Sequence, residues 1–167
     1  MSERLDYGLL NTQTDPRFGE RKYGRLGTMA KNGCGLIALY NVERAAFPNT
    51  EFESFYAGRK TIKTNLFGLL GTRPSAVRKN LEAKGFQTER IPKKKAELAP
   101  RYDAVIVLYW YWFGAHYVTG IADQNDKYRL YNMFTEPYPM RLSEYLQYLG
   151  KHRKFVVRVW GIRFPKA

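Results

Sequence analysis

Apolar residues recur at helical spacing in the first half of the chain and at strand spacing in the second half. The stretch 34–46 is apolar nearly all round, with Leu36, Ile37, Leu39, Tyr40, Val42, Ala45 and Ala46. A helix with this pattern is buried in the middle of a domain. Asn32 is expected to cap the start of this helix, and Pro48 is expected to end it.

Turn residues mark the remaining elements of the first half. The segment 71–75 (Gly-Thr-Arg-Pro-Ser) opens a clear helix, which Gly85 is expected to end. A short helix is predicted between residues 51 and 59. Residues 1–27 are polar and rich in glycine, so they are expected to be mostly irregular.

The pattern of the second half predicts strands and one more helix. The predicted strands cover residues 86–91, 104–110, 116–121, 127–132 and 155–162, and the helix covers residues 142–149. The run 104–110 is continuously apolar, which is typical of a strand buried on both faces. Turn residues at 123–126 predict a hairpin between the third and fourth strands. Helices followed by an antiparallel sheet indicate an α+β fold, built as a single domain over residues 1–167.

The composition is that of a folding chain with excess positive charge. The 167 residues include 28 Lys and Arg against 15 Asp and Glu, for a net charge of +13. This charge attracts polyanions and acidic proteins. The basic residues form short clusters without a nucleic-acid-binding motif, so no specific nucleic-acid partner is expected. A polyanion-binding function is kept as an alternative. Binding that persists at physiological salt would support it.

Other classes of protein are excluded by what the sequence lacks. No run approaches the ~18 apolar residues of a membrane span. The N-terminus carries no apolar signal segment, so a cytoplasmic location is expected, with delivery by another route left open. One cysteine and two histidines are too few for a disulfide or an ordinary zinc site, so no metal and no cofactor is expected. The oligomeric state is not specified by the sequence.

The candidate chemistry begins at Cys34, the only cysteine. It stands where a turn leads into the predicted helix 34–46, and the positive end of the helix dipole favours its thiolate. His116 begins a predicted strand, and Asn132 ends the next one. The order Cys, His, Asn is that of papain-type thiol enzymes.

Each of these residues also has a structural interpretation. A lone cysteine is most often a small buried apolar residue, and a strand-end asparagine often only caps or turns the chain. Asp123 is the rival of Asn132 as the residue that orients the imidazole. The second histidine, His152, lies in a basic cluster and is expected to be solvated.

Four segments together give the chain a resemblance to the papain-like cysteine peptidases, within the peptidase C39-like group. They are residues 32–35 (Asn-Gly-Cys-Gly), 71–74 (Gly-Thr-Arg-Pro), 115–118 (Ala-His-Tyr-Val) and 131–132 (Tyr-Asn). The resemblance extends over roughly residues 28–163. It implies a papain-like α+β fold, with an N-terminal helical half that carries the cysteine and a C-terminal antiparallel sheet that carries the histidine and the asparagine.

The resemblance also implies a function and two departures from the family pattern. It implies a cysteine peptidase that cleaves a peptide or amide bond through Cys34, His116 and Asn132, where C39-like proteins often have Asp as the third residue. The family usually has a Gln a few residues before the cysteine, and here that position is Thr28. Asn32 or Thr28 would then assist the Cys34 N–H in the oxyanion hole.

The substrate side and the competing functions follow from the same region. Trp110, Trp112 and Gly114 precede His116 and are expected to line the substrate cleft. The expected partner is a peptide or protein substrate, and an acidic one would suit the positive charge. A deamidase or an acyltransferase would use the same triad. A catalytically silent papain-like fold that binds a peptide or protein without cutting it is the alternative from a different class.

Overall fold

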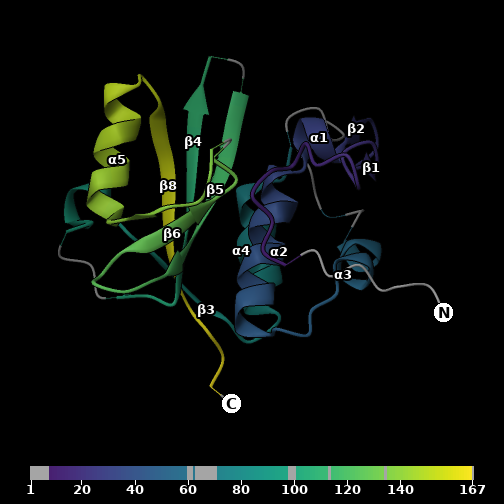
Figure 1. Cartoon of the computed structure of the whole chain (residues 1–167), viewed down its shortest axis with the longest axis horizontal. Coiled ribbons are helices and arrows are strands. Elements are labelled where there is room, and N and C mark those ends of the chain that lie inside the picture. Colours follow the sequence, from purple (N-terminus) through teal and green to yellow (C-terminus); the bar gives the residue numbers. More distant parts are fainter. Residues whose placement is uncertain are drawn as a thin grey trace.

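The computed structural model describes residues 8–59, 62, 71–97, 101–112, 114–133 and 135–166. Its elements separate into a helical half and a sheet half (Figure 1). Helices α2 (Cys34–Ala46) and α4 (Pro74–Glu82) lie on one side of the sheet, and α5 (Leu142–Lys151) lies on the other. The sheet is antiparallel throughout its described pairs, so the predicted α+β class is confirmed.

The helical half is built around α2. Its other elements are β1 (Lys22–Tyr23), β2 (Gly27–Thr28), α1 (Met29–Asn32), α3 (Phe52–Arg59) and α4. Helix α2 covers the apolar stretch 34–46, and α4 begins at Pro74 as expected. No helix of the described segments is long and apolar enough to cross a membrane.

The start of α2 differs from the expectation, because Gly33 rather than Asn32 precedes its first residue. Asn32 is the last residue of α1, a single helical turn. The Gly33 N–H donates to the Met29 carbonyl at 2.8 Å, and a side chain at Gly33 would clash with Met29. The chain therefore makes a tight turn of helix first, and Asn32 is not available as a cap.

The sheet half has six strands in the order β3-β8-β4-β5-β6-β7. The strands are β3 (Gln87–Arg90), β4 (Ala104–Tyr111), β5 (Gly114–Ala122), β6 (Tyr128–Tyr131), β7 (Pro139–Met140) and β8 (Phe155–Arg163). A short 3-10 turn, η2 (Lys93–Lys95), follows β3. Strand β4 pairs with β5 and β8, and its alternate residues enter the buried clusters on the two sides of the sheet, which explains its continuous apolar run.

The two faces of the sheet bury separate sets of side chains. Ile106, Leu108 and Tyr117 belong to the core shared with α2. Val107 and Val118 belong to the core shared with α5. Because neighbouring residues of a strand point to opposite faces, the register of β4 and β5 decides which side chains of β5 can meet α2.

A buried carboxylate joins three parts of the helical half. Glu43 of α2 has a side chain only 1% exposed and forms ion pairs with Arg59 Nη2 at 2.6 Å and Lys84 Nζ at 2.9 Å. Arg59 ends α3 and Lys84 follows α4. Helices α3 and α4 are therefore tied to α2 by charge as well as by apolar contact.

Replacing Glu43 with Gln should lower the free energy of unfolding by about 3 kcal/mol, because Arg59 then keeps a largely buried charge without a countercharge. Urea denaturation followed by circular dichroism measures this. Glu82→Gln is the matched control, since Glu82 pairs with Arg78 at 3.1 Å on the exposed face of α4. That change should cost less than about 1 kcal/mol. Equal effects of the two substitutions would contradict the role of Glu43.

Candidate active site

Cys34 is the first residue of α2 and lines a pocket of about 170 Å³. The side chain is 5% exposed. The other walls come from the segment around Thr72, from the end of β4 and from the start of β5. The expected residues Asn32, Trp110 and Gly114 are part of this lining. The cysteine therefore lies at the junction of the helical half and the sheet.

Two glycines allow the start of α2 to lie this close to its neighbours. Gly35 packs against Thr72, whose side chain would clash with any Cβ at that position. Gly33 packs against Met29 in the same way. Thr72 is itself held by the Tyr117 hydroxyl, which donates to the Thr72 carbonyl at 3.0 Å. The Gly-Cys-Gly sequence is thus required by packing on both sides of the cysteine.

Burial raises the pKa of the Cys34 thiol to about 11, although the backbone N–H groups of Tyr117, Gly35 and Cys34 itself oppose the rise. The helix-start argument predicted the opposite direction. The N–H groups that it invoked are present, but desolvation of the sulfur is the larger effect. The resting cysteine is therefore a neutral thiol at pH 7.

His116 lies in β5 opposite Tyr109 of β4, and its ring packs against the Tyr109 ring at a centroid distance of 5.6 Å. The ring is 2% exposed. Burial lowers the pKa of His116 to about 4, the Asn132 carbonyl raises it and Lys154 lowers it further. At pH 7 the imidazole is therefore neutral.

The His116 ring is oriented by a main-chain group. Its Nε2 lies 2.6 Å from the carbonyl oxygen of Asn132. Because a carbonyl only accepts, Nε2 carries the proton, and Nδ1 carries the lone pair of the neutral ring. This is the tautomer that a general base acting through Nδ1 requires.

Asn132 is fully buried. The resemblance to papain-type triads implied a hydrogen bond from its side chain to the imidazole, but the side chain bonds other groups. Its Oδ1 accepts from the Gln13 N–H at 3.2 Å, and its Nδ2 donates to the Tyr117 carbonyl at 3.2 Å. The residue has a φ of +66°, which turns its carbonyl rather than its amide toward the ring. The rival orienter, Asp123, pairs with Arg129 at 2.9 Å at the far end of β5.

The structure brings some of the expected site residues together and leaves others apart. The N–H of Tyr117 contacts Cys34, and Tyr117 directly follows His116. Among the described residues, no hydrogen bond joins Cys34 Sγ to the His116 ring, and neither His116 nor Asn132 lines the pocket. Tyr117 packs on the α2 face of β5, so the neighbouring His116 faces the α5 side, where its ring meets Tyr109. Thr28 pairs with Lys22 in the small hairpin and is not among the described residues that line the pocket. Trp112 is 87% exposed and is likewise not among them.

Two contributing residues were not identified from the sequence. Thr72 holds the first turn of α2 and one end of Tyr117. In the sequence, Thr72 is marked only by its place in the segment 71–75, which predicts a helix start. Gln13 contacts Asn132 from a segment expected to be irregular. No local pattern could reveal that contact, because the two residues are 119 positions apart.

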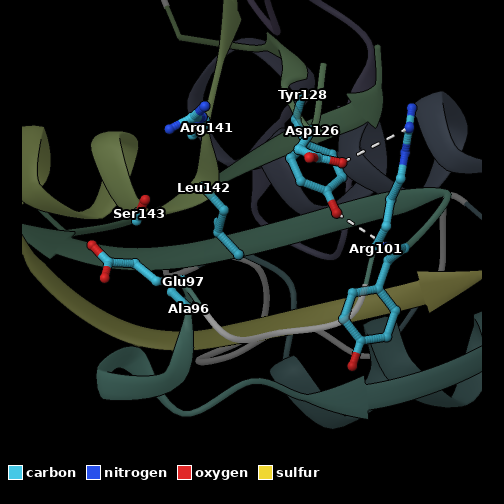
Figure 2. A pocket seen from close by; sticks show the side chains of 9 residues that line it. Ala96, Glu97, Arg101, Asp126, Tyr128, Arg141, Leu142 and Ser143 are labelled. Carbon is cyan, nitrogen blue, oxygen red and sulfur yellow. Dashed lines mark hydrogen bonds and ion pairs between the residues drawn. The ribbon is translucent and has the colours of Figure 1, made fainter. Parts of the chain in front are cut away.

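Another cavity lies away from Cys34, on the side of the sheet covered by α5. It measures about 590 Å³ and is lined by residues of both charge signs, including Arg101, Asp126 and Arg141 (Figure 2). Arg101 lies 4.0 Å from Asp126. None of the expected site residues contributes to this cavity.

Comparison with known proteins gives a likeness at the level of structure. No protein-family description and no curated protein matches the sequence. The peptidase domain of Streptococcus ComA, a bi-functional ABC transporter involved in quorum sensing, matches with a TM-score of 0.53 at 16% identity, covering 80% of this chain and 91% of that domain. A double glycine motif protease from an AMS/PCAT transporter, solved with the leader peptide, matches with a TM-score of 0.51 at 13% identity, covering 80% and 84%. The chain therefore has the papain-like fold of C39 peptidase domains, as its sequence resemblance predicted.

The low pKa of His116 should make stability depend on pH. The unfolded chain takes up a proton near the ordinary value of 6.5, whereas folded His116 does so only near 4. The free energy of unfolding should therefore be fully present above pH 6.5 and fall by up to about 3 kcal/mol as the pH drops through this window. Urea denaturation at pH 7.5, 6.0, 5.0 and 4.5 measures the fall.

His116→Gln tests whether this residue is the cause. Gln does not titrate, and its amide can still donate to the Asn132 carbonyl, so the decline below pH 6.5 should be smaller in this variant. His152→Gln, which replaces the histidine whose ring contacts Tyr148, should keep the wild-type decline. An unchanged decline in His116→Gln would exclude the buried imidazole as its source.

Proposed function

We propose that this protein is a thiol hydrolase that cleaves a peptide or amide bond, with Cys34 as the nucleophile and His116 as the general base. The observation that carries the proposal is the contact between Cys34 and the backbone N–H of Tyr117, the residue that follows His116. This contact joins the cysteine to the strand that bears the imidazole, at a pocket open to a substrate. The likeness in fold to C39 peptidase domains supports the same reading.

The reaction starts from two neutral groups. His116 Nδ1 takes the thiol proton as Sγ attacks the substrate carbonyl carbon, which gives a tetrahedral oxyanion and an imidazolium. In this proposal the Cys34 N–H and the amide of Asn32, which lines the pocket, stabilise the oxyanion. The imidazolium then protonates the leaving amine as the carbon–nitrogen bond breaks. Water, deprotonated by the same ring, releases the acid from the thioester and restores the thiol.

This mechanism requires the His116 ring, which faces the α5 side of β5 and does not line the pocket, to turn toward Sγ when substrate binds. Hydrogen bonds of catalytic groups are commonly long before substrate binds and shorten in the complex. The Asn132 carbonyl keeps its bond to Nε2 and stabilises the imidazolium as it forms. A substrate that fills the pocket also excludes water, which strengthens the attraction between thiolate and imidazolium.

The lining of the pocket indicates the kind of substrate. Trp110 is 47% exposed and offers an aromatic surface beside the cysteine. Lys31 is the only charged residue among the described lining residues, and its charge is positive. We propose a polypeptide substrate with a bulky apolar residue near the scissile bond, and an acidic one suits the net charge of +13. The AMS/PCAT domain solved with a leader peptide is a precedent for a peptide ligand on this fold.

A catalytically silent binding fold is the second candidate, and one observation favours it. Burial raises the pKa of Cys34 and lowers that of His116, so both directions oppose a resting thiolate–imidazolium pair. A binding protein would use the same pocket and keep Cys34 as a packing residue. Measurements of cleavage and of thiol reactivity separate the two candidates.

Wild-type protein should cleave members of a peptide library, and Cys34→Ala and His116→Ala should each lose at least about 1000-fold in kcat/KM, because either loss removes a group that acts in the transition state. Mass spectrometry of the products measures this. Cys34→Ala should still bind the peptides that wild-type cleaves. If wild-type binds peptides and leaves them intact, the enzyme proposal is wrong and the silent fold takes its place.

Alkylation of Cys34 by iodoacetamide is the companion measurement. The rate should keep rising toward pH 11, because the thiolate becomes common only near the raised pKa. If the ring assists deprotonation, His116→Ala should label at least about tenfold more slowly than wild-type at pH 7. Equal rates in both proteins would mean that the ring does not assist the thiol before substrate binds, and the choice between the two candidates would then rest on the cleavage assay.

Trp110 and Trp112 belong to the same hairpin and offer a matched test of whether Trp110 contacts the substrate. Trp110→Leu should raise KM about tenfold with little change in kcat, because Trp110 lines the pocket that contains Cys34. Trp112→Leu should leave both constants near wild-type, since Trp112 is 87% exposed. Steady-state kinetics on one cleaved peptide measures both. If Trp112→Leu raised KM and Trp110→Leu did not, the substrate would instead bind at the tip of the hairpin.

A further inference from the structure

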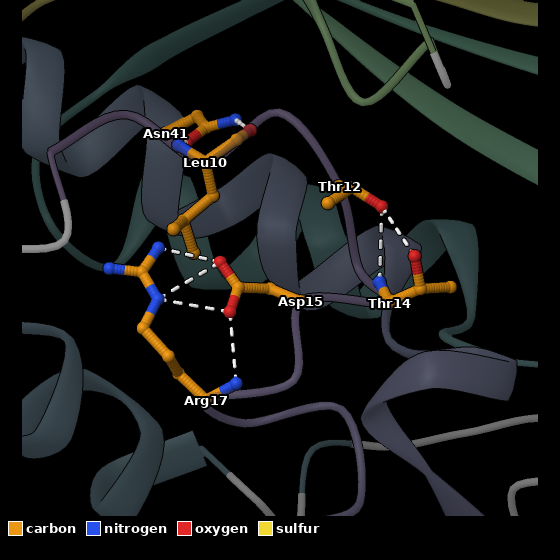
Figure 3. A network of polar contacts seen from close by, with 6 residues as sticks. All are labelled: Leu10, Thr12, Thr14, Asp15, Arg17 and Asn41. Atoms are coloured by element: carbon orange, nitrogen blue, oxygen red, sulfur yellow. Dashed lines mark hydrogen bonds and ion pairs between the residues drawn. The ribbon is translucent and has the colours of Figure 1, made fainter.

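The segment 10–17, here called the N-terminal strap, is anchored to the middle of α2. Asn41 of α2 is fully buried and forms two hydrogen bonds with Leu10 (Figure 3). Its Oδ1 accepts from the Leu10 N–H at 2.7 Å, and its Nδ2 donates to the Leu10 carbonyl at 2.8 Å. A paired contact of this kind fixes the position and the direction of the strap at its start.

Hydrogen bonds within the strap fix its conformation beyond Leu10. The hydroxyl groups of Thr12 and Thr14 lie 2.8 Å apart, and the Asp15 carboxylate accepts from Arg17 Nε at 2.9 Å (Figure 3). Between them, Gln13 is only 5% exposed. Its Nε2 donates to the Ala30 carbonyl at 2.8 Å, which links the strap to the turn before Cys34.

Asn132 is held by this strap on three of its polar atoms. The Gln13 N–H donates to Asn132 Oδ1 at 3.2 Å, and Asn132 Nδ2 lies 3.5 Å from Gln13 Oε1. Asn11 Oδ1 accepts from the Asn132 N–H at 3.2 Å. Asn132 has a left-handed backbone conformation, with φ of +66°, that is unfavourable for most residues unless neighbours stabilise it.

Asn132 in turn contacts the two neighbouring residues of β5 that matter for the site. Its carbonyl accepts from His116 Nε2 at 2.6 Å, and its Nδ2 donates to the Tyr117 carbonyl at 3.2 Å. Strand β6 pairs with β5 only from Thr119 to Ala122. Along the part of β5 before Thr119, Asn132 therefore supplies contacts where a paired strand would otherwise supply them.

We infer that Gln13 and Asn11 are positioning residues for the imidazole: the N-terminal strap fixes Asn132, and Asn132 aims its carbonyl at His116 Nε2. The catalytic meaning of this inference rests on the proposed function. The positioning role itself does not rest on the proposed function, because Gln13 and Asn11 fix the ring whether or not the ring takes part in a reaction.

Gln13→Met tests the side-chain part of the inference, because Met has a similar volume and forms neither side-chain hydrogen bond, while the bond from the Gln13 N–H to Asn132 Oδ1 remains. Thr14→Ala is the control, since it removes a hydroxyl of the strap that does not contact Asn132. Proton NMR resolves the ring signals of the only two histidines, and the signal of His152 serves as an internal reference. Tyr109, Lys154 and Asn132 contact or act on the His116 ring and are unchanged in both variants.

In Gln13→Met the titration midpoint of His116 should rise from about 4 toward the ordinary value of 6.5, as a loosened ring gains contact with water. Steady-state kinetics should show kcat reduced about 10- to 100-fold with KM changed less than about twofold, because a displaced base slows chemistry and leaves binding intact. Thr14→Ala should match wild-type in both measurements.

Each outcome decides a different claim. If Gln13→Met leaves the His116 titration at its wild-type position, the inference is overturned. If wild-type cleaves no peptide while the titration shifts as expected, the proposed function fails and the positioning role stands. If Gln13→Met does not fold, Asn11→Ala replaces it and should shift the His116 titration in the same direction, because it removes the Oδ1 acceptor of the Asn132 N–H. A wild-type titration in Asn11→Ala would likewise overturn the inference.

Discussion

The burial of α2 against the sheet is the constraint on which the other features depend. Residues Cys34 to Glu43 are all buried, so the helix is enclosed by β4 and β5 on one side and by the other helices around it. Apolar contact supplies the driving force. Polar contacts, such as the Thr119 hydroxyl with the Ala38 carbonyl at 3.5 Å, accompany the apolar packing between helix and strand. Cys34 meets β5 because the first turn of this helix cannot move without exposing the rest.

The same burial that positions the cysteine opposes its ionisation. An ionised group loses hydration inside a protein, so burial favours the neutral thiol and the neutral imidazole alike. Backbone N–H groups near Cys34 and the Asn132 carbonyl near His116 act in the other direction without reversing it. An enzyme built in this way would form charge only when substrate is bound, and a binding protein would never form it. The chemistry of the site therefore depends on how burial changes with a ligand.

Buried polar residues outside the triad form a connected set rather than isolated pairs. Asn41, Gln13 and Asn132 are each at most 5% exposed, and each bonds a backbone group of a distant segment. A buried polar side chain without partners is costly, so such residues persist where every bond is made. Here the bonds run from the middle of α2, along the N-terminal strap, to the edge of β5.

Local patterns determined the elements and named the chemical groups. The apolar stretch of α2, the proline at the start of α4, the buried run of β4 and the order of Cys34, His116 and Asn132 are all readable along the chain, because period and turn chemistry are local. Tertiary structure alone decided that Gly33 precedes α2, that a carbonyl orients His116, and that Gln13 holds Asn132. It also decided the direction of both pKa shifts, since the desolvation that dominates them exists only once the chain has folded.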